Sequence, residues 1–322
     1  MTAVALLSNP RASGNPAPLP AIRAFCARHA DIFHYEVEHQ GQIADALRTI
    51  ARVRPKLLVI NGDDGAVQET LSELYHGGHF GEQLPPVGVL PHDASNLIAR
   101  DLGADGCPIA ALARMLALAR ADMMPHVISR RLISLTGGRG DNRRPVLGMF
   151  LCGGGLADTV LNCRHNIYPL GLPHRAAHGL ALLLGLASLM VGRRRPPPAN
   201  RAPLSVSAGR GGAISGAYPF LVVTTLESPL RFGADAGTAT GALHLLVIER
   251  RLGAVLGALL AWFCGRLGAS AIRGVHVARD DEISISGGGA SVVLDGALFE
   301  AQEDRPILLR PSGPMPFLRL AA

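Results

Sequence analysis

Lysine, aromatic residues and cysteine are scarce in this sequence. Lys56 is the only lysine among 322 residues, and aromatic residues make up 4% of the chain. The sequence contains no zinc-ligand spacing, no aromatic stacking platform and no basic recognition helix, which argues against nucleic acid as a partner. The five cysteines are scattered without a CxxC pair, so neither a disulfide framework nor a cysteine metal site is predicted.

Segments for membrane insertion and secretion are also missing. The apolar helix candidate His178–Val191 is shorter than the roughly 18–20 residues that span a bilayer. The N-terminus, MTAVALLSNP, has no basic segment and a very short apolar run, so it is not a signal peptide. We expect a protein of the reducing cytoplasm.

Arginine supplies nearly all of the positive charge. The net charge of +6 and the pI near 9.5 favour anionic partners, of which nucleotides and acidic lipid headgroups fit best. Hydrophobic residues make up 48% of the sequence, which is enough for a sizeable core. A chain of this length is expected to form two domains.

One stretch organises the rest, KLLVINGDDGAVQETLSE over Lys56–Glu73. Its apolar run Leu57–Ile60 has the length of a buried parallel strand, and a helix follows from Val67. The turn between them, Asn61–Ala66, has two glycines that let backbone N–H groups approach an anion at the helix N-terminus. Because carboxylates repel phosphate, an aspartate here is expected to hold Mg²⁺ or to polarise a hydroxyl. The alternative is an ordinary turn with solvated aspartates.

Strands and helices alternate along the first part of the chain. The predicted strands are Ala3–Ser8, Ile32–Val37, Leu57–Ile60 and Pro86–Leu90, and the helices include Pro20–His29 and Gln42–Val53. This alternation predicts a parallel α/β sheet, in which ligands lie outside the carboxyl ends of the strands. Three loops follow strands and are expected to meet at one edge: Asn9–Gly14, Asn61–Ala66 and Pro91–Asn96.

From about Met124 the pattern changes to short, often β-branched segments separated by glycine, proline or charge. The strands predicted there are Val127–Leu135, Val146–Cys152, Leu204–Ala208, Phe220–Thr225, Ala242–Ile248, Gly274–Ala278, Glu282–Ser286, Ala290–Leu294 and Pro306–Arg310. Such segments predict an antiparallel sandwich or barrel. Helical insertions are predicted at His178–Val191, as a buried or a lipid-facing helix, and at Ala254–Arg266. The run Arg193, Arg194, Arg195 is either a solvated turn or a site for anionic lipid headgroups.

Taken in order, these motifs resemble the diacylglycerol kinase catalytic-domain superfamily, which includes bacterial diacylglycerol kinases, sphingosine kinases and ceramide kinases. The family's N-P-x-S-G turn is similar to Asn9–Gly14, which has one extra residue. Its G-G-D-G-T-x-N-E motif is matched by Gly62–Glu69, and its P-x-G-T-x-N-D-x-A-R motif by Pro91–Arg100. Near the C-terminus, Asp295–Ala297 stands where the family has D-G-E. The resemblance covers nearly the whole chain.

The chain departs from the family motifs at several positions, and each departure changes the local chemistry. Glycines are replaced by Asp63 and Asp93, threonines by Ala66 and Ala94, and the glutamate usually taken as general base by Ala297. The Asp63 charge either repels nucleotide or serves as an extra Mg²⁺ ligand. Thr240–Leu243 replaces the D-D-G-L of the family's structural metal site.

The resemblance implies an α/β nucleotide-binding domain with a parallel sheet, of the NAD kinase and diacylglycerol kinase type, over residues 1–124. Residues 307–322 return to that domain, and residues 125–306 form an antiparallel β-sandwich domain that accepts lipid. It also implies transfer of the γ-phosphoryl group of ATP, with Mg²⁺, to a hydroxyl of diacylglycerol, ceramide or a sphingoid base. The lipid would be met at the inner face of the cytoplasmic membrane.

By this resemblance Asp64 positions the metal or the acceptor hydroxyl, and Asp295, or in second place Asp158, acts as general base. Further ATP-binding candidates are Asn9, Arg11, Ser13, Gly14, Asn61, Gly62, Asp63, Gly65, Ala66, Glu69, His92 and Asn96. Four of these residues also have a structural interpretation. Asp295 would form a hairpin turn and Arg11 a solvated turn, and Asp158 and His92 would have surface or capping roles.

Two other functions stay open. A catalytically impaired member that binds lipid or nucleotide is supported by the replaced threonines and glutamate. An NAD kinase-like small-molecule kinase would share the glycine-aspartate turn. The opening Asn-Pro turn and the motif spacing favour the lipid kinase.

Overall fold

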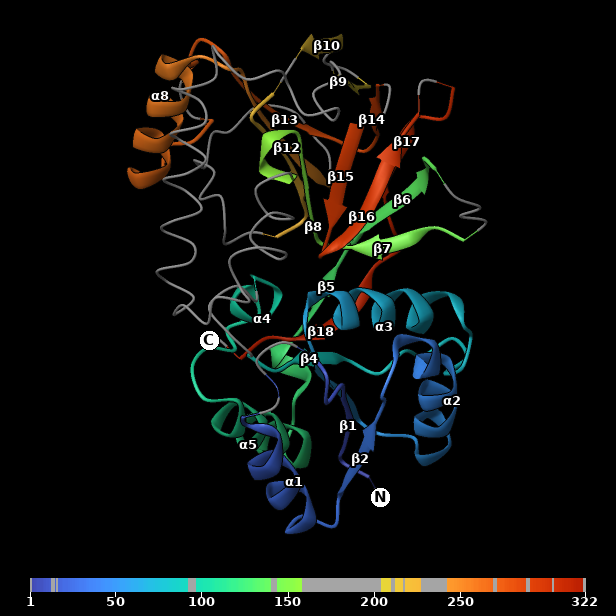
Figure 1. Cartoon of the computed structure of the whole chain (residues 1–322). Coiled ribbons are helices and arrows are strands. Elements are labelled where there is room, and N and C mark those ends of the chain that lie inside the picture. Colours follow the sequence, from blue (N-terminus) through green and yellow to red (C-terminus); the bar gives the residue numbers. More distant parts are fainter. Residues whose placement is uncertain are drawn as a thin grey trace. The chain divides into compact units, whose positions relative to one another are not determined.

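The computed structural model describes residues 2–12, 15, 17–91, 97–139, 144–157, 204–209, 212–216, 218–226, 242–268, 271–287, 290–302 and 304–320. The chain forms two compact units (Figure 1). The first comprises Met1–Leu132 and Gly313–Ala322, and the second comprises Ile133–Ser312. Their boundaries differ from the expected 124 and 307 because β5 (Val127–Arg130) pairs in the sheet of the first unit, whereas β17 (Ile307–Pro311) pairs in the second.

The first unit is built on one six-stranded sheet, in the order β2-β1-β3-β4-β18-β5. Its other strands are β1 (Val4–Ser8), β2 (Ile32–Glu36), β3 (Leu57–Asn61), β4 (Val87–Val89) and β18 (Met315–Leu318). All neighbours in this order run parallel except β18 and β5, which are antiparallel. The central strands β1 and β3 are buried along their whole length, as expected of strands covered on both faces.

Helices connect the parallel strands of the first unit. They are α1 (Leu19–Ala27), α2 (Ile43–Val53), α3 (Asp64–His76), α4 (Leu97–Asp101) and α5 (Pro108–Arg120), with short 3₁₀ turns at Gln40–Gln42 and Met124–His126. In α2 the buried residues Ile43, Leu47 and Ile50 recur every three to four positions, which places one apolar face against the core. The predicted parallel α/β domain is confirmed.

The second unit contains two antiparallel six-stranded sheets, in the orders β10-β9-β14-β17-β6-β7 and β13-β12-β11-β8-β15-β16. The first of these adds β6 (Ile133–Gly137), β7 (Val146–Gly148), β9 (Leu204–Ala208), β10 (Gly212–Gly216) and β14 (Ile283–Ser286). The second consists of β8 (Phe150–Gly153), β11 (Phe220–Thr224), β12 (Leu243–Ile248), β13 (Val275–Asp280), β15 (Ala290–Leu294) and β16 (Ala297–Ala301). Strands β10 and β16 are additions to the predicted set.

A single hydrophobic core joins the two sheets of this unit. It includes Leu135 and Ile283 from one sheet and Leu151 and Leu221 from the other, so the sheets form a sandwich and the prediction is confirmed. On the other face of the second sheet lies α8 (Leu252–Phe263), which matches the second predicted helical insertion in place. The helix predicted at 178–191 and the arginines 193–195 lie outside the described residues. Within the part of the chain that is described, no helix is long and apolar enough to cross a bilayer.

Candidate functional site

The carboxyl ends of β1 and β3 lie side by side in the first unit. Ser8 and Asn61 are paired at the last position of these strands, and the Asn9 N–H donates to the Asn61 carbonyl at 2.9 Å. Strand β4 continues the same edge, where the Leu90 N–H donates to the Ile60 carbonyl at 2.9 Å. The three predicted loops therefore leave the sheet from neighbouring strands on one edge, where ligands of parallel sheets bind.

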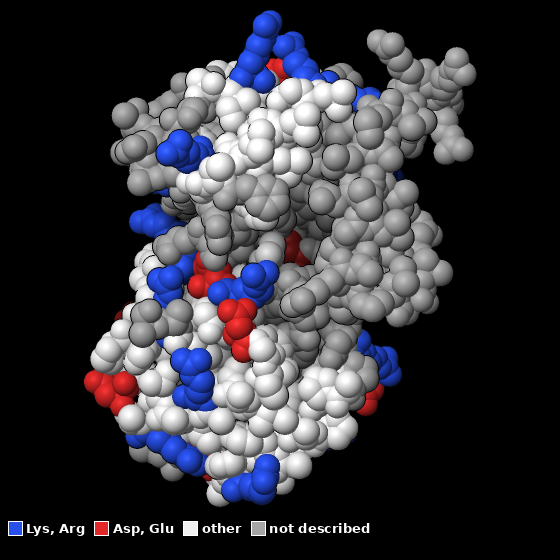
Figure 2. Space-filling model, turned by 90° about the vertical axis from the view of Figure 1, so that its left-hand side faces the viewer, with Lys and Arg blue, Asp and Glu red and all other residues white. Residues whose placement is uncertain are grey.

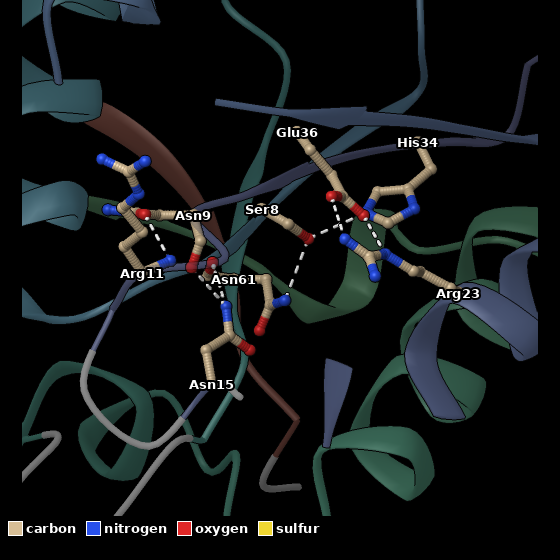
Figure 3. A network of polar contacts seen from close by, with 8 residues as sticks. All are labelled: Ser8, Asn9, Arg11, Asn15, Arg23, His34, Glu36 and Asn61. Atoms are coloured by element: carbon tan, nitrogen blue, oxygen red, sulfur yellow. Dashed lines mark hydrogen bonds and ion pairs between the residues drawn. The ribbon is translucent and has the colours of Figure 1, made fainter. Parts of the chain in front are cut away.

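Asn9 and Asn15 fold the first loop back on itself. The Asn9 Oδ1 accepts the Arg11 N–H at 3.0 Å, and the Asn9 carbonyl accepts the Ala12 N–H at 3.2 Å. The buried Asn15 amide donates through Nδ2 to the Asn9 carbonyl at 2.6 Å and to the Asn61 carbonyl at 3.4 Å (Figure 3). Asn15 thus ties the loop after β1 to the end of β3.

Two amide groups at this edge have unused hydrogen-bonding capacity. Asn15 and Asn61 are fully buried, and the Oδ1 of each has no hydrogen-bond partner among the described residues. Asn61 makes one side-chain bond, from Nδ2 to the Ser8 Oγ at 2.9 Å, so one of its polar atoms lacks a partner whichever way the amide is turned. Buried polar atoms normally have partners, so the two oxygens fit donors supplied by a ligand.

A polar chain runs from the same edge to the surface of the unit (Figure 3). The Ser8 Oγ also contacts the His34 Nε2 at 2.9 Å, and Glu36 two residues further on holds Arg23 through two bonds of 2.6 and 2.7 Å. Burial lowers the pKa of His34, which keeps the imidazole neutral against Ser8. The Arg23 hydrogen bond lowers the pKa of Glu36, so the outer end of the chain is a surface ion pair.

The turn after β3 packs tightly against the first loop. A Cβ on Gly62 would lie 2.7 Å from the Ala66 Cβ and 3.8 Å from the Asn9 Cβ, so only glycine fits there without displacing a neighbour. Asp63 follows in an extended conformation and caps α3, its Oδ1 accepting the Ala66 N–H at 3.1 Å. The helix therefore begins at Asp64, earlier than the predicted Val67, because the Asp63 side chain satisfies one of its first N–H groups.

Asp64 occupies the first turn of α3, in a partly exposed position next to the cap. Gly65 and Ala66 are buried beneath it, while Glu69 is partly buried one turn further along. Burial, followed by the neighbouring Glu73 charge, raises the pKa of Glu69 above its ordinary value. The turn thus presents the carboxylates of Asp63 and Asp64 beside the positive end of a thirteen-residue helix.

The other predicted ligand residues lie at the surface or outside the described residues. Arg11 is exposed and lies 4.0 Å from Glu38 in a surface ion pair. Ser13, Gly14, His92, Asn96 and Asp158 lie outside the described residues. Asn15, Ser8 and His34 were not predicted as site residues, although the polar ends of the otherwise apolar strands β1 and β3 are visible in the sequence.

Asp295 lies in the second unit and is almost completely buried. Its two carboxylate oxygens accept the N–H groups of Met149 at 2.7 Å and Phe150 at 2.9 Å, where the chain passes from β7 to β8. Asp295 and Gly296 form the two-residue loop between β15 and β16, with φ values of 43° and 88°, the geometry of an Asp-Gly hairpin. Burial raises the pKa of Asp295 to about 7, although the two N–H donors oppose the shift. Its catalytic role stays a prediction.

The donor set at the turn after β3 fits Mg²⁺ of the kind that binds together with phosphates. Mg²⁺ takes one or two carboxylates from the protein and keeps its other positions for water and phosphate oxygens. Asp64 and the second oxygen of Asp63 supply that number. No group of three or more His, Cys, Asp or Glu side chains in the described residues would hold a metal by itself.

Comparison with known proteins agrees with this geometry. Residues 3–125 match the family model described as diacylglycerol kinase catalytic domain. The match covers most of the first unit and is to the family that the motifs resemble, which supports the predicted resemblance.

The fold of the whole chain has counterparts among solved structures. A diacylglycerol kinase from Bacillus anthracis str. Sterne superposes with a TM-score of 0.61 at 15% identity, covering 98% of this chain and 96% of that one. A second structure from this organism, of a protein assigned to the diacylglycerol kinases, gives a TM-score of 0.62 at 16% identity over 96% and 94% of the two chains. No curated protein sequence matches the chain.

Proposed function

We propose that the protein transfers the γ-phosphoryl group of ATP to a hydroxyl of a membrane lipid, with diacylglycerol, ceramide and sphingoid bases as the candidate acceptors. The observation that carries the proposal is the edge of the first unit, where the Asn9–Asn15 loop and the Gly62–Asp64 turn are joined by hydrogen bonds and close packing. This edge lies within the segment that matches the kinase domain family.

The unpartnered asparagine oxygens support a nucleotide as the donor. Asn15 Oδ1 and Asn61 Oδ1 are acceptors, and phosphate oxygens at neutral pH offer no strong donor to them. The amino group of adenine and the hydroxyls of ribose are donors of the required kind. In this proposal the side-chain amides of Asn15 and Asn61 bind the nucleoside, and the backbone N–H groups at the α3 N-terminus bind the phosphates.

The carboxylates at the turn support a phosphoryl-transfer role. Asp64, with Asp63 beside it, is the group that would hold Mg²⁺, which when bound neutralises charge on the β- and γ-phosphates. Asp64 is anchored in the first turn of α3, while Gly62 and Asp63 fix the backbone before it. Phosphoryl transfer depends mainly on such positioning, so a site that lacks the family's glutamate is still a competent arrangement.

A lipid acceptor is supported by the family name and by the charge of the chain. The net charge of +6 favours the anionic surface at which such a lipid is found. We assign the protein to the cytoplasmic side of a membrane as a peripheral enzyme.

The test is label transfer from [γ-³²P]ATP in mixed micelles that contain diacylglycerol, ceramide or sphingosine, with NAD as a soluble acceptor in a parallel reaction. We expect label in one lipid class and a dependence on Mg²⁺. Lipid binding without label would favour a non-catalytic lipid-binding protein. Label in NAD would favour a small-molecule kinase, and either result would contradict the proposal.

A further inference from the structure

Helix α8 of the second unit is apolar on all sides. Between Leu252 and Gly265 the sequence contains no charged residue. One face of the helix packs on the second sheet of the sandwich, where Ala254, Val255 and Ala258 join Val222 and Leu246 in a small core. A water-exposed helix normally turns a polar face outward, so the character of the opposite face is informative.

The opposite face of α8 exposes leucines. Leu252, Leu256 and Leu260 are 59%, 54% and 67% exposed, and their spacing of four residues places them on one side of the helix. Trp262, near the C-terminal end, is 38% exposed. Among the described residues, seven large hydrophobic side chains are exposed, and four of these belong to α8. Such a concentration on one element marks a surface that meets an apolar partner.

Arginines flank this leucine face. Arg250 and Arg251 precede the helix and Arg266 follows it, all of them exposed. From Glu249 to Arg273 the chain has four arginines and one acid, and that acid, Glu249, is bound to Arg251 at 3.1 Å and to His276 at 3.0 Å. The face of the molecule that Figure 2 turns to the viewer shows Lys and Arg side chains at the margins of a white area in its upper part.

We propose that α8 is a membrane-docking helix, which lies in the plane of an anionic bilayer surface with its leucines in the acyl region and its arginines at the headgroups. The combination of an apolar face, basic ends and a tryptophan near one end is that of interfacial helices. Twelve residues span about 18 Å, less than the roughly 30 Å of a bilayer core, so the helix lies on the membrane.

A bilayer fits this surface better than a protein partner does. Specific protein interfaces bring together about 20–30 residues on each side, many of them polar, whereas the outer face of α8 offers three leucines with arginines at both ends of the helix. Anionic headgroups complement those cations directly. The inference rests on the proposed function, which places the lipid substrate in the membrane to which α8 binds. Its test measures only the binding of the protein to vesicles.

Trp262 provides the measurement without engineering, because it is the only tryptophan in the chain. Full-length protein is titrated with vesicles of phosphatidylglycerol and phosphatidylcholine, and with vesicles of phosphatidylcholine alone. We expect a blue shift of the tryptophan emission with the anionic vesicles, quenching by brominated acyl chains, and sedimentation of the protein with the vesicles. High salt weakens the binding, because the arginines contribute to it.

Substitutions on α8 test the surface directly. Leu256→Glu is expected to weaken vesicle binding at least about tenfold, since it removes an exposed leucine that would enter the acyl region and adds a charge of the same sign as the membrane surface. Arg266→Gln is expected to weaken it about fivefold. The matched controls are Leu298→Glu, another exposed leucine of this unit, and Arg52→Gln, an exposed arginine of the first unit, and both should bind as the unchanged protein does.

The outcomes separate docking from catalysis. Circular dichroism and thermal unfolding show first that Leu256→Glu is folded, and phosphotransfer to a short-chain acceptor dispersed in detergent should be unchanged in it. The inference is overturned if Trp262 emission does not respond to either vesicle, or if Leu256→Glu binds as tightly as the unchanged protein. It is also overturned if α8 instead mediates a concentration-dependent dimer. None of these results affects label transfer in detergent, which alone decides the proposed function.

Discussion

Two acidic turns of this protein, Asp63–Asp64 at the start of α3 and Asp295–Gly296 between β15 and β16, use similar residues in different surroundings. At the first turn, one carboxylate oxygen of Asp63 accepts the Ala66 N–H and caps the helix. Asp64 is partly exposed at the carboxyl edge of a parallel sheet. At the second, both oxygens of Asp295 accept main-chain N–H groups inside the sandwich. The difference shows how burial separates a carboxylate that lies partly exposed at the edge of a parallel sheet from one that holds two strands together inside the sandwich.

The largest expected effect on activity comes from Asp64→Ala. Loss of this carboxylate should reduce kcat for phosphotransfer by about 100-fold or more, because charge stabilisation of the transferring group is lost. The thermal unfolding temperature should change little, since the side chain is partly exposed. Asp45→Ala, at an exposed aspartate of α2 paired with Arg48, is the control for charge removal. Full activity of Asp64→Ala would remove Asp64 from the site.

Asp295→Ala is expected to have the largest effect on stability. The substitution leaves the Met149 and Phe150 N–H groups without their acceptor, which costs about 1–3 kcal/mol for each buried donor. Denaturant unfolding followed by Trp262, which belongs to the same unit, measures this loss. Asp295→Asn tests the predicted base role: a stable variant with kcat reduced by about 100-fold would favour catalysis over a structural role.

Gly62→Ala tests the close packing at the first turn. The added methyl group meets the Ala66 Cβ at 2.7 Å, so we expect a loss of about 1–3 kcal/mol in the unfolding free energy of the first unit. In the double variant Gly62→Ala, Ala66→Gly the clash is removed, and the two effects should be less than additive. Additive effects, measured by hydrogen exchange in α3 and β3, would mean that the two positions do not touch.

Asp63 should contribute to stability through its helix cap. Asp63→Ala is expected to cost about 1 kcal/mol, while Asp63→Asn and Asp63→Ser keep an acceptor for the Ala66 N–H and should retain most of the stability. If Asp63 also holds Mg²⁺, then Asp63→Asn needs a higher Mg²⁺ concentration for half-maximal activity although its stability is normal. An unchanged Mg²⁺ requirement would leave Asp63 with the capping role alone.

A pH dependence is also expected for the stability of the second unit. The pKa of Asp295 is raised from an ordinary value of 3.8 to about 7, so between these pH values the folded unit binds a proton that the unfolded chain releases. The Asp295 contribution to the unfolding free energy therefore declines as pH rises from about 4 to about 7 and is constant above. This decline should be absent in Asp295→Asn when both proteins are followed by Trp262 fluorescence. If the unfolding free energy declined equally with pH in both proteins, the pH dependence would not come from Asp295.

Much of the first unit was predictable because local patterns determine it. Buried parallel strands such as Leu57–Ile60 appear as short apolar runs, and the polar turns after them mark the carboxyl edge. The early start of α3 was missed because Asp63 was interpreted as a replaced phosphate-loop glycine, although an aspartate three residues before Ala66 is also a helix cap. Asn15 was missed because its role depends on Asn61, which is distant in the sequence.

The second unit was predictable in class but less so in detail. The apolar runs Val127–Leu135 and Val146–Cys152 each contain two strands of different sheets, and a hydrophobic pattern does not show where a chain changes sheet. Strand β10 was missed because its residues are mostly exposed and include two glycines. The hairpin at Asp295–Gly296 follows from its Asp-Gly sequence, whereas the bonds from Asp295 to Met149 and Phe150 depend on tertiary structure.

A crystal structure with Mg²⁺ and a non-hydrolysable ATP analogue would test the central claim most directly. We predict phosphate oxygens within hydrogen-bond distance of backbone N–H groups at the start of α3, Asp64 next to the metal, and the amides of Asn15 and Asn61 facing the nucleoside. A nucleotide bound away from this edge, or phosphates remote from Asp64, would contradict the account.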